Sequence, residues 1–355
     1  YTDCLRWRSC LCIKRNFMPA WVIDKYGNND VLRFTNNASF PVINYPNEVI
    51  VKVFAAGLNP LDVSMRGGYG SATLAMKRDP LNIMQSGNEF PLVLGRDVSG
   101  VVMECGLDVK YFRERDEVWA AIPPWKQGSL AEFVVLSANE ISHKPKSMSH
   151  TEAAAIPYVA TTAWSALVNT GGLSKDNSPR VWLPHLLAGV SVFMAILVWT
   201  VPVAMAALRN AGRFHGFRAR VRETWTLRFD LRWALGLLKP WTRAKYMTLL
   251  TPFLLNTDQM SIADSMLQTA ATVATKAIKH LVKGVHYRWG FFAPSGPALD
   301  EIREMVDAGQ IRAVVEETFS FSQVPQAFEK VEKGHARGKT VVEIKSKENQ
   351  KEGQK

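Results

Sequence analysis

The segment 334–339 has a composition that suits contact with a phosphate group. It reads GHARGK, so that His335, Arg337 and Lys339 lie close to two glycines. Glycines let a backbone approach a ligand closely, and arginine and lysine suit phosphate oxygens. On pattern alone, however, the segment is more typical of a solvated turn between a helix and a strand. The residues by themselves therefore leave a phosphate contact and a plain turn open.

Two other polar side chains can hydrogen-bond the carbonyl oxygen of a substrate. They are Asn59, in the segment LNP, and Tyr69, in the segment GGYG. Both segments are also typical of turns, so a structural explanation stays open. We interpret Arg96-Asp97 as a structural ion pair rather than as a site. No Ser-His-Asp or paired-carboxylate pattern is evident in the sequence.

Length and charge limit the classes of protein to consider. The 355 residues suit two domains. The formal charge of +11 is concentrated at 209–245, where ten Lys or Arg residues face two acids. Because this basicity is local, we expect no nucleic-acid partner. Three of the four cysteines lie in the first twelve residues. This distribution is typical of neither a disulfide framework nor a structural zinc site, and it indicates a reducing compartment.

The elements that must position these side chains change in type along the chain. From Met18 to about Val135, short apolar segments such as EVIVKVFAAG alternate with turn residues, which predicts a small β-barrel. Ser149 and Glu152 predict a capping box at the start of helical sequence. A strand is predicted within 244–256. Helices are predicted at 265–284, at 298–310, and after Ser322, which we expect to be a cap, before a final strand.

The two ends of the chain look different from the body. Residues 1–17 are basic and poor in acids, which resembles the end of an organelle transit peptide. A disordered basic end is the alternative, and in either case we set this segment apart from the fold. Residues 345–355 read KSKENQKEGQK and are predicted to be a disordered tail.

Four stretches, taken in order, resemble one protein family. They are AAGLNPLDVSMRGGYG (55–70), PLVLGRDVSGVV (91–102), SHTEAAAIPYVATTAWSAL (149–167) and KGHARGKTVVEI (333–344). Together they resemble the zinc-free quinone oxidoreductase branch of the medium-chain dehydrogenase/reductase superfamily. The resemblance implies an α/β protein with a GroES-like β-barrel catalytic domain and a Rossmann-like cofactor domain. The catalytic domain would comprise 18–165 and 287–344, and the cofactor domain 166–286.

The same resemblance implies a function and a set of contacts. It implies that NADPH reduces a quinone or enone in mitochondria without a metal, and that a reticulon-type membrane protein is a partner. Zinc-dependent relatives carry ligands where this chain has Asn59 and Arg96-Asp97, and Asn is a poor zinc ligand while Arg is none. A quinone or enone is already electrophilic, so the hydride comes from the cofactor and water can supply the proton. The implied cofactor contacts are Gly189, Val190, Leu249, Gly290, Phe292, His335, Ala336 and Arg337.

The chain departs from the family pattern at 181–232. The family has a glycine-rich loop after Arg180-Val181, and such a loop binds a pyrophosphate at a helix N-terminus. Here the sequence reads VWLPHLLAGVSVF, in which only Gly189 and Val190 match. We therefore expect a Rossmann-like domain that is truncated or disrupted in this segment.

Three explanations for this segment are open. Residues 181–208 carry no fixed charge and are long enough to span a bilayer, so a membrane anchor is the first. The arginines that follow the run agree with it. The second is a buried strand and helix of a variant domain. The third, which the abrupt edges of 182–232 favour, is that this is not native coding sequence. If the cofactor site is lost, the alternative function is a catalytically impaired interaction or membrane-associated protein.

Overall fold

The computed structural model describes residues 16–71, 89–172, 240–241, 245–248, 262–290, 292–334 and 336–344. The segment 181–232 and the tail 345–355 lie outside this range. So do four of the predicted cofactor contacts: Gly189, Val190, Leu249 and His335. The first strand, β1 (Phe17–Ile23), begins one residue inside the segment that the sequence analysis set apart from the fold.

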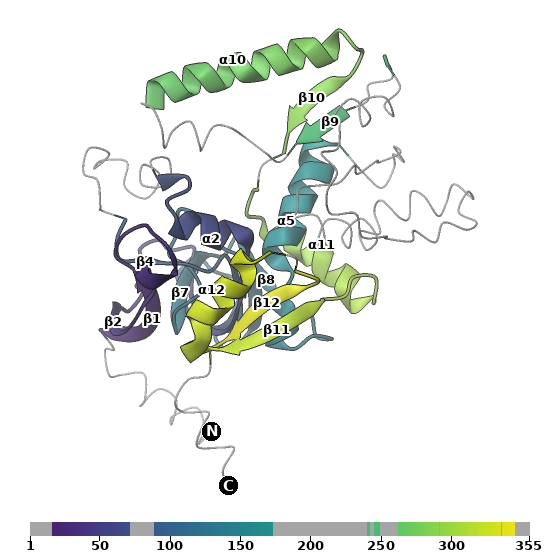
Figure 1. Ribbon diagram of the computed structural model, residues 1–355. Coiled ribbons are helices and arrows are strands. Elements are labelled where there is room, and N and C mark those ends of the chain that lie inside the picture. Colours follow the sequence, from purple (N-terminus) through teal and green to yellow (C-terminus); the bar gives the residue numbers. More distant parts are fainter. Residues whose placement is uncertain are drawn as a thin grey trace.

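A seven-stranded sheet lies at the centre of the described structure (Figure 1). Its order is β11 (Val315–Ser320), β12 (Lys339–Glu343), β3 (Glu48–Leu58), β5 (Asp97–Cys105), β6 (Glu117–Ala121) and β8 (Ile141–His143), and β7 (Phe133–Ser137) also pairs with β3. Only the β11–β12 pair is parallel. Because β12 pairs with β3, sequence from both ends of the chain meets in one sheet, as the family resemblance implies.

The central strand β3 explains how the sheet is held together. It pairs with β5, with β7 over its first half and with β12 over its second half. Its sequence EVIVKVFAAGL is buried at every position except Lys52 and Phe54, which are half-buried. The alternation seen in the sequence is therefore only partial, because neighbours cover both faces of the strand.

A second, three-stranded sheet completes the barrel. Its order is β2 (Arg33–Ser39), β1 and β4 (Leu92–Val93), and η1 (Asn29–Val31) precedes β2. An isolated bridge joins Ala20 to Ala131, which follows the loop after β6. Apolar side chains of both sheets share one core, which also takes in Phe328 from the C-terminal part of the chain. This architecture confirms the predicted GroES-like barrel.

Helices connect and cover the sheets. They are α2 (Pro60–Arg66), α4 (His150–Ala153), α5 (Pro157–Trp164), η2 (Ser165–Thr170), α11 (Gly296–Asp307), η3 (Phe321–Gln323) and α12 (Val324–Glu332). The predicted capping box is confirmed, since the Glu152 amide donates to Ser149 Oγ at 3.3 Å and the Ser149 amide donates to Glu152 Oε2 at 2.9 Å. The predicted cap at Ser322 is wrong: a 3-10 turn precedes α12, and Ser320 caps that turn.

The remaining described elements form a smaller group at one end of the molecule, reached through α5 (Figure 1). They are β9 (Lys245–Thr248), α10 (Ile262–Leu281) and β10 (His286–Trp289), and β10 pairs with β9 in parallel. The strand predicted within 244–256 and the helix predicted at 265–284 are thus confirmed. Because β10 belongs to this group, we propose that the catalytic domain resumes after Trp289 rather than at residue 287.

No described helix combines the length and the apolar character that crossing a membrane requires. The predicted span 181–208 lies outside the described residues, so the structure does not test the membrane-anchor explanation.

Candidate active site

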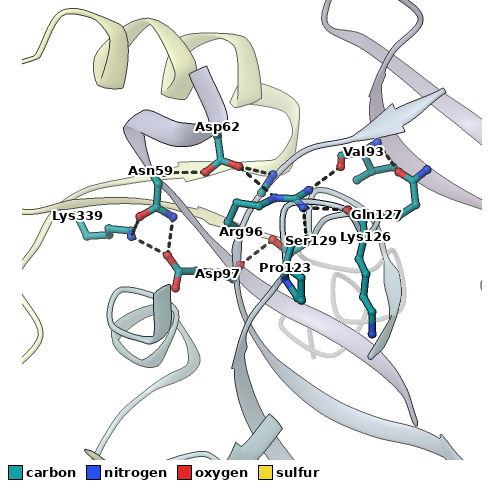
Figure 2. A network of polar contacts seen from close by, with 11 residues as sticks. Asn59, Asp62, Val93, Arg96, Asp97, Pro123, Lys126, Gln127, Ser129 and Lys339 are labelled. Atoms are coloured by element: carbon teal, nitrogen blue, oxygen red, sulfur yellow. Dashed lines mark hydrogen bonds and ion pairs between the residues drawn. The ribbon is translucent and has the colours of Figure 1, made fainter. Parts of the chain in front are cut away.

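A buried cluster of three polar side chains lies where β3, β5 and β12 meet (Figure 2). The Lys339 ammonium donates to Asn59 Oδ1 at 2.6 Å and to Asp97 Oδ2 at 2.6 Å. The Asn59 amide donates to the same Asp97 oxygen at 2.8 Å. These side chains come from positions up to 280 residues apart in the chain. All three are almost fully buried, so the cluster is closed to bulk water.

Local structure holds each member of this cluster. Asn59 precedes α2, in which Pro60 occupies the first helical position. The backbone amide of Asn59 donates to Asp62 Oδ2 at 2.8 Å. Asp97 begins β5 and Lys339 begins β12, and both strands pair with β3. Asn59 therefore has a positioning part in this arrangement, and direct contact of Asn59 with a substrate stays a prediction.

A second buried ion pair lies beside the first (Figure 2). Arg96 Nε lies 3.6 Å from Asp62 Oδ1, and the Arg96 guanidinium also donates to the carbonyls of Val93, Pro123 and Lys126 at 2.8–2.9 Å. Burial raises the pKa of Asp62, and the Arg96 charge opposes that effect. The predicted ion pair between Arg96 and Asp97 is therefore wrong: Arg96 pairs with Asp62, and Asp97 pairs with Lys339, because strand pairing brings these distant side chains together.

An aromatic pair borders the cluster. The Tyr158 amide donates to Asp97 Oδ1 at 2.6 Å, which ties the start of α5 to the polar cluster. The Tyr158 ring stacks on Phe292 with a centroid distance of 4.3 Å and an interplanar angle of 16°. Burial raises the pKa of the Tyr158 phenol, and the nearby Asp62 charge adds to this effect. Sequence reasoning missed Tyr158, although it stands in the family-like segment IPYVATTAW.

Tyr69, the other predicted substrate contact, belongs to the surroundings of Tyr158. It lies just after α2 and is half-buried, and its amide donates to the carbonyl of Ser64 at 3.0 Å. Its phenol is among the groups that influence the pKa of Tyr158. Tyr69 therefore lies in the same region as Tyr158 and Phe292, which is consistent with its predicted role without testing it.

The described residues of the GHARGK segment place its two described cations in different surroundings. Glu316 on β11 accepts from the amides of Arg337 at 2.8 Å and Gly338 at 3.3 Å, and Lys330 on α12 donates to it at 2.9 Å. The hydrogen bond from Lys330 is the main reason why the pKa of Glu316 is lowered. Arg337 is exposed, whereas Lys339 is buried against Asp97. Lys339 is therefore withdrawn from a phosphate, and Arg337, one of the cofactor contacts that the resemblance implies, is the exposed cation among the described residues of the segment.

The described residues fit part of a nicotinamide dinucleotide. Arg337 is a cation at the surface of an ordered loop, and arginine binds phosphate oxygens well. Ala336 is half-buried beside it. Gly290 is buried directly after β10, and Phe292 offers a half-buried aromatic ring that an aromatic ligand ring can contact. In the described part of the chain, no three His, Cys, Asp or Glu side chains come together as a metal site.

Comparisons with known proteins agree with this architecture. The alcohol dehydrogenase GroES-like domain family matches residues 45–146. The zinc-binding dehydrogenase family matches residues 204–342, which includes part of the segment that the sequence analysis could not match. A solved quinone oxidoreductase from Coxiella burnetii has a similar fold, with a TM-score of 0.62 at 23% identity over 93% of this chain and 100% of that one.

Similarity in sequence extends along the whole chain. The mitochondrial NAD(P)H oxidoreductase RTN4IP1 of Danio rerio is 61% identical over 98% of this chain and 99% of the relative. The mitochondrial reticulon-4-interacting protein 1 of Caenorhabditis elegans is 29% identical over 93% of this chain and 96% of the relative. The chain therefore belongs to the family of the mitochondrial NAD(P)H oxidoreductase RTN4IP1, within the medium-chain dehydrogenases/reductases.

Proposed function

We propose that this protein is a mitochondrial oxidoreductase in which NADPH reduces a quinone or an enone without zinc. One observation carries the proposal: Lys339, which directly follows the predicted cofactor loop, bonds Asn59 and Asp97. Two of these residues occupy the places where zinc-dependent relatives carry ligands. A divalent cation would have to displace a buried ammonium that lies 2.6 Å from the Asp97 carboxylate, and Asn59 would be a poor replacement ligand.

The residues divide the work between cofactor and acceptor. When NADPH is bound, it supplies the hydride. Arg337 would bind a phosphate of the cofactor, and Ala336 and His335 are the neighbouring cofactor contacts that the family resemblance implies. Gly290 and Phe292 are further contacts that it implies, and Gly290 would let the backbone approach the cofactor closely. Tyr69 orients the carbonyl group of the acceptor.

The preference for NADPH over NADH rests on Arg337. An arginine at the surface of an ordered loop suits the additional phosphate of NADPH because its guanidinium donates two parallel hydrogen bonds. Glu316 accepts hydrogen bonds from the backbone amides of Arg337 and Gly338, so we infer that the Arg337 side chain rather than these amides binds the phosphate. Arg337→Ala is expected to weaken NADPH binding by about 10-fold or more and NADH binding less.

Titration of the purified full chain with NADPH tests the proposal. We expect saturable binding, followed by turnover of 1,4-naphthoquinone and 3-penten-2-one that is insensitive to a metal chelator. No binding at millimolar NADPH would refute the enzymatic function of this chain. That result would instead support the catalytically impaired interaction or membrane-associated protein. Extraction of membranes with alkaline carbonate then separates those two alternatives, because an integral membrane protein resists it.

The localisation and the partner follow from relatives. Relatives named as mitochondrial support a mitochondrial location. The name of the nematode relative includes interaction with a reticulon, which supports a reticulon-type membrane protein as a partner here too. Co-purification of the full chain with such a protein from mitochondria is the corresponding test.

A further inference from the structure

Tyr158 contacts both the buried polar cluster of Asn59, Asp97 and Lys339 and the proposed cofactor contact Phe292. It is the second residue of α5, and Pro157 before it occupies the first helical position. The bond from its amide to Asp97 Oδ1 anchors the start of this helix. Asp97 in turn is held by Lys339 and Asn59. The backbone of Tyr158 is therefore fixed to a fully buried carboxylate of the site.

The ring of Tyr158 faces the proposed cofactor side. It lies nearly parallel to Phe292, with a centroid distance of 4.3 Å, and Phe292 is a predicted cofactor contact. This stacking restricts rotation of the Tyr158 side chain. A fixed backbone and a restricted ring give the phenol oxygen a defined position, which is what a preorganised hydrogen-bond donor requires.

The hydroxyl group of Tyr158 is available to a ligand. None of the described residues donates a hydrogen bond to it or accepts one from it, and the residue as a whole is half-buried. Burial and the Asp62 charge raise the pKa of this phenol. It therefore keeps its proton near neutral pH and acts as a donor rather than as a base.

We propose that the Tyr158 hydroxyl donates a hydrogen bond to the carbonyl oxygen of the quinone or enone. This inference rests on the proposed function. A hydride adds to the acceptor while NADPH becomes NADP⁺, and negative charge develops on the acceptor oxygen. The Tyr158 hydroxyl stabilises that charge and keeps its own proton. Water then supplies the proton that completes the reduced product.

The substitution Tyr158→Phe tests this role because it removes the hydroxyl and keeps the ring that stacks on Phe292. We expect kcat for 1,4-naphthoquinone and for 3-penten-2-one to fall about 100-fold, as loss of one donor to a developing oxyanion typically does. The dissociation constant for NADPH and the thermal midpoint should stay within about twofold and a few degrees of wild type, because Phe preserves the packing. Tyr45→Phe, which removes the hydroxyl of an exposed tyrosine, is the matched control.

Three results overturn the inference. A Tyr158→Phe variant with wild-type kcat shows that the hydroxyl does not touch the acceptor. A variant that loses NADPH binding in parallel with kcat shows a structural role for the residue. A wild-type chain that binds NADPH but reduces neither acceptor refutes the proposed function, and the inference with it, whereas the first two results leave the proposed function intact.

Discussion

Replacing Lys339 with Met removes the positive partner of a buried carboxylate while keeping most of the aliphatic side chain. The side chains of Lys339 and Asp97 are 4% and 0% exposed, and their charged atoms lie 2.6 Å apart. Removing one member of a buried ion pair costs about 3–5 kcal/mol, because the remaining charge has lost both water and partner. Asn59 and the Tyr158 amide continue to donate to Asp97. We therefore expect the lower part of that range, about 3 kcal/mol.

Urea unfolding of the full chain measures this loss, with the free energy of unfolding obtained by linear extrapolation. The same measurement on Asp97→Asn and on the double variant closes a mutant cycle. Because the two groups are in direct contact, the double variant should be more stable than the sum of the single effects predicts, by at least about 1 kcal/mol.

Lys330→Met is the matched control for Lys339→Met. Lys330 also bonds a carboxylate, that of Glu316 at 2.9 Å, but these side chains are 32% and 22% exposed and so remain in contact with water. Ion pairs that stay hydrated contribute little to stability, so this variant should unfold close to the wild-type urea concentration. Equal effects of the two substitutions, or a mutant cycle without coupling, would refute the argument that burial makes the Lys339–Asp97 pair important.

Three further predictions concern the cofactor loop, the barrel and pH. Glu316→Ala removes the acceptor of the Arg337 amide and so leaves the cofactor loop less firmly held. NADPH binding in a titration should weaken about threefold to tenfold, and an unchanged affinity would contradict this role of Glu316. Gly57→Ala places a β-carbon against the carbonyl oxygen of Ala154 and should lower stability by about 1–3 kcal/mol in urea unfolding; an unchanged midpoint would contradict it. Burial lowers the pKa of the His150 imidazole in the folded chain. As the pH falls, His150 therefore becomes protonated in the unfolded chain before it does so in the folded chain. The stability that the neutral His150 contributes above about pH 6.5 is lost as the pH falls further. His150→Gln should flatten the pH dependence of the thermal midpoint between about pH 5.5 and 7.5, and an equally steep dependence would exclude His150 as its source.

Local sequence patterns predicted elements well where short-range chemistry decides the structure. The capping box of Ser149 and Glu152 and the helices at 265–284 and 298–310 depend on residues three or four positions apart. The cap at Ser322 was predicted wrongly because Ser320, two residues earlier, offers the same chemistry and caps a 3-10 turn. Sequence pattern identifies a cap more readily than it chooses between neighbouring candidates.

The candidate site was predicted in part. Asn59, Tyr69, Phe292 and Arg337 were singled out from segments that resemble the family, and all four lie among the described residues. The burial of Lys339 was not predictable from the segment GHARGK, because its sequence does not indicate which cationic side chain points into the protein. Its burial follows from the register of β12 on β3, in which Thr340 lies opposite Leu58.

The sequence by itself indicated a β-rich N-terminal part followed by helices, and the side chains of Asn59, Arg96 and Asp97 are no usual set of zinc ligands. The family resemblance of the sequence implied that both ends of the chain share one barrel. Only the tertiary structure decided which charges pair. Lys339 reaches Asp97 across 242 positions of sequence, and Arg96 forms an ion pair with Asp62 rather than with Asp97, its neighbour in the sequence. The physical reason is that periodicity records whether a side chain is buried, whereas the partner of a buried charge depends on strand pairing between distant segments. The tertiary structure likewise brings Tyr158 of α5 against Phe292, which follows β10.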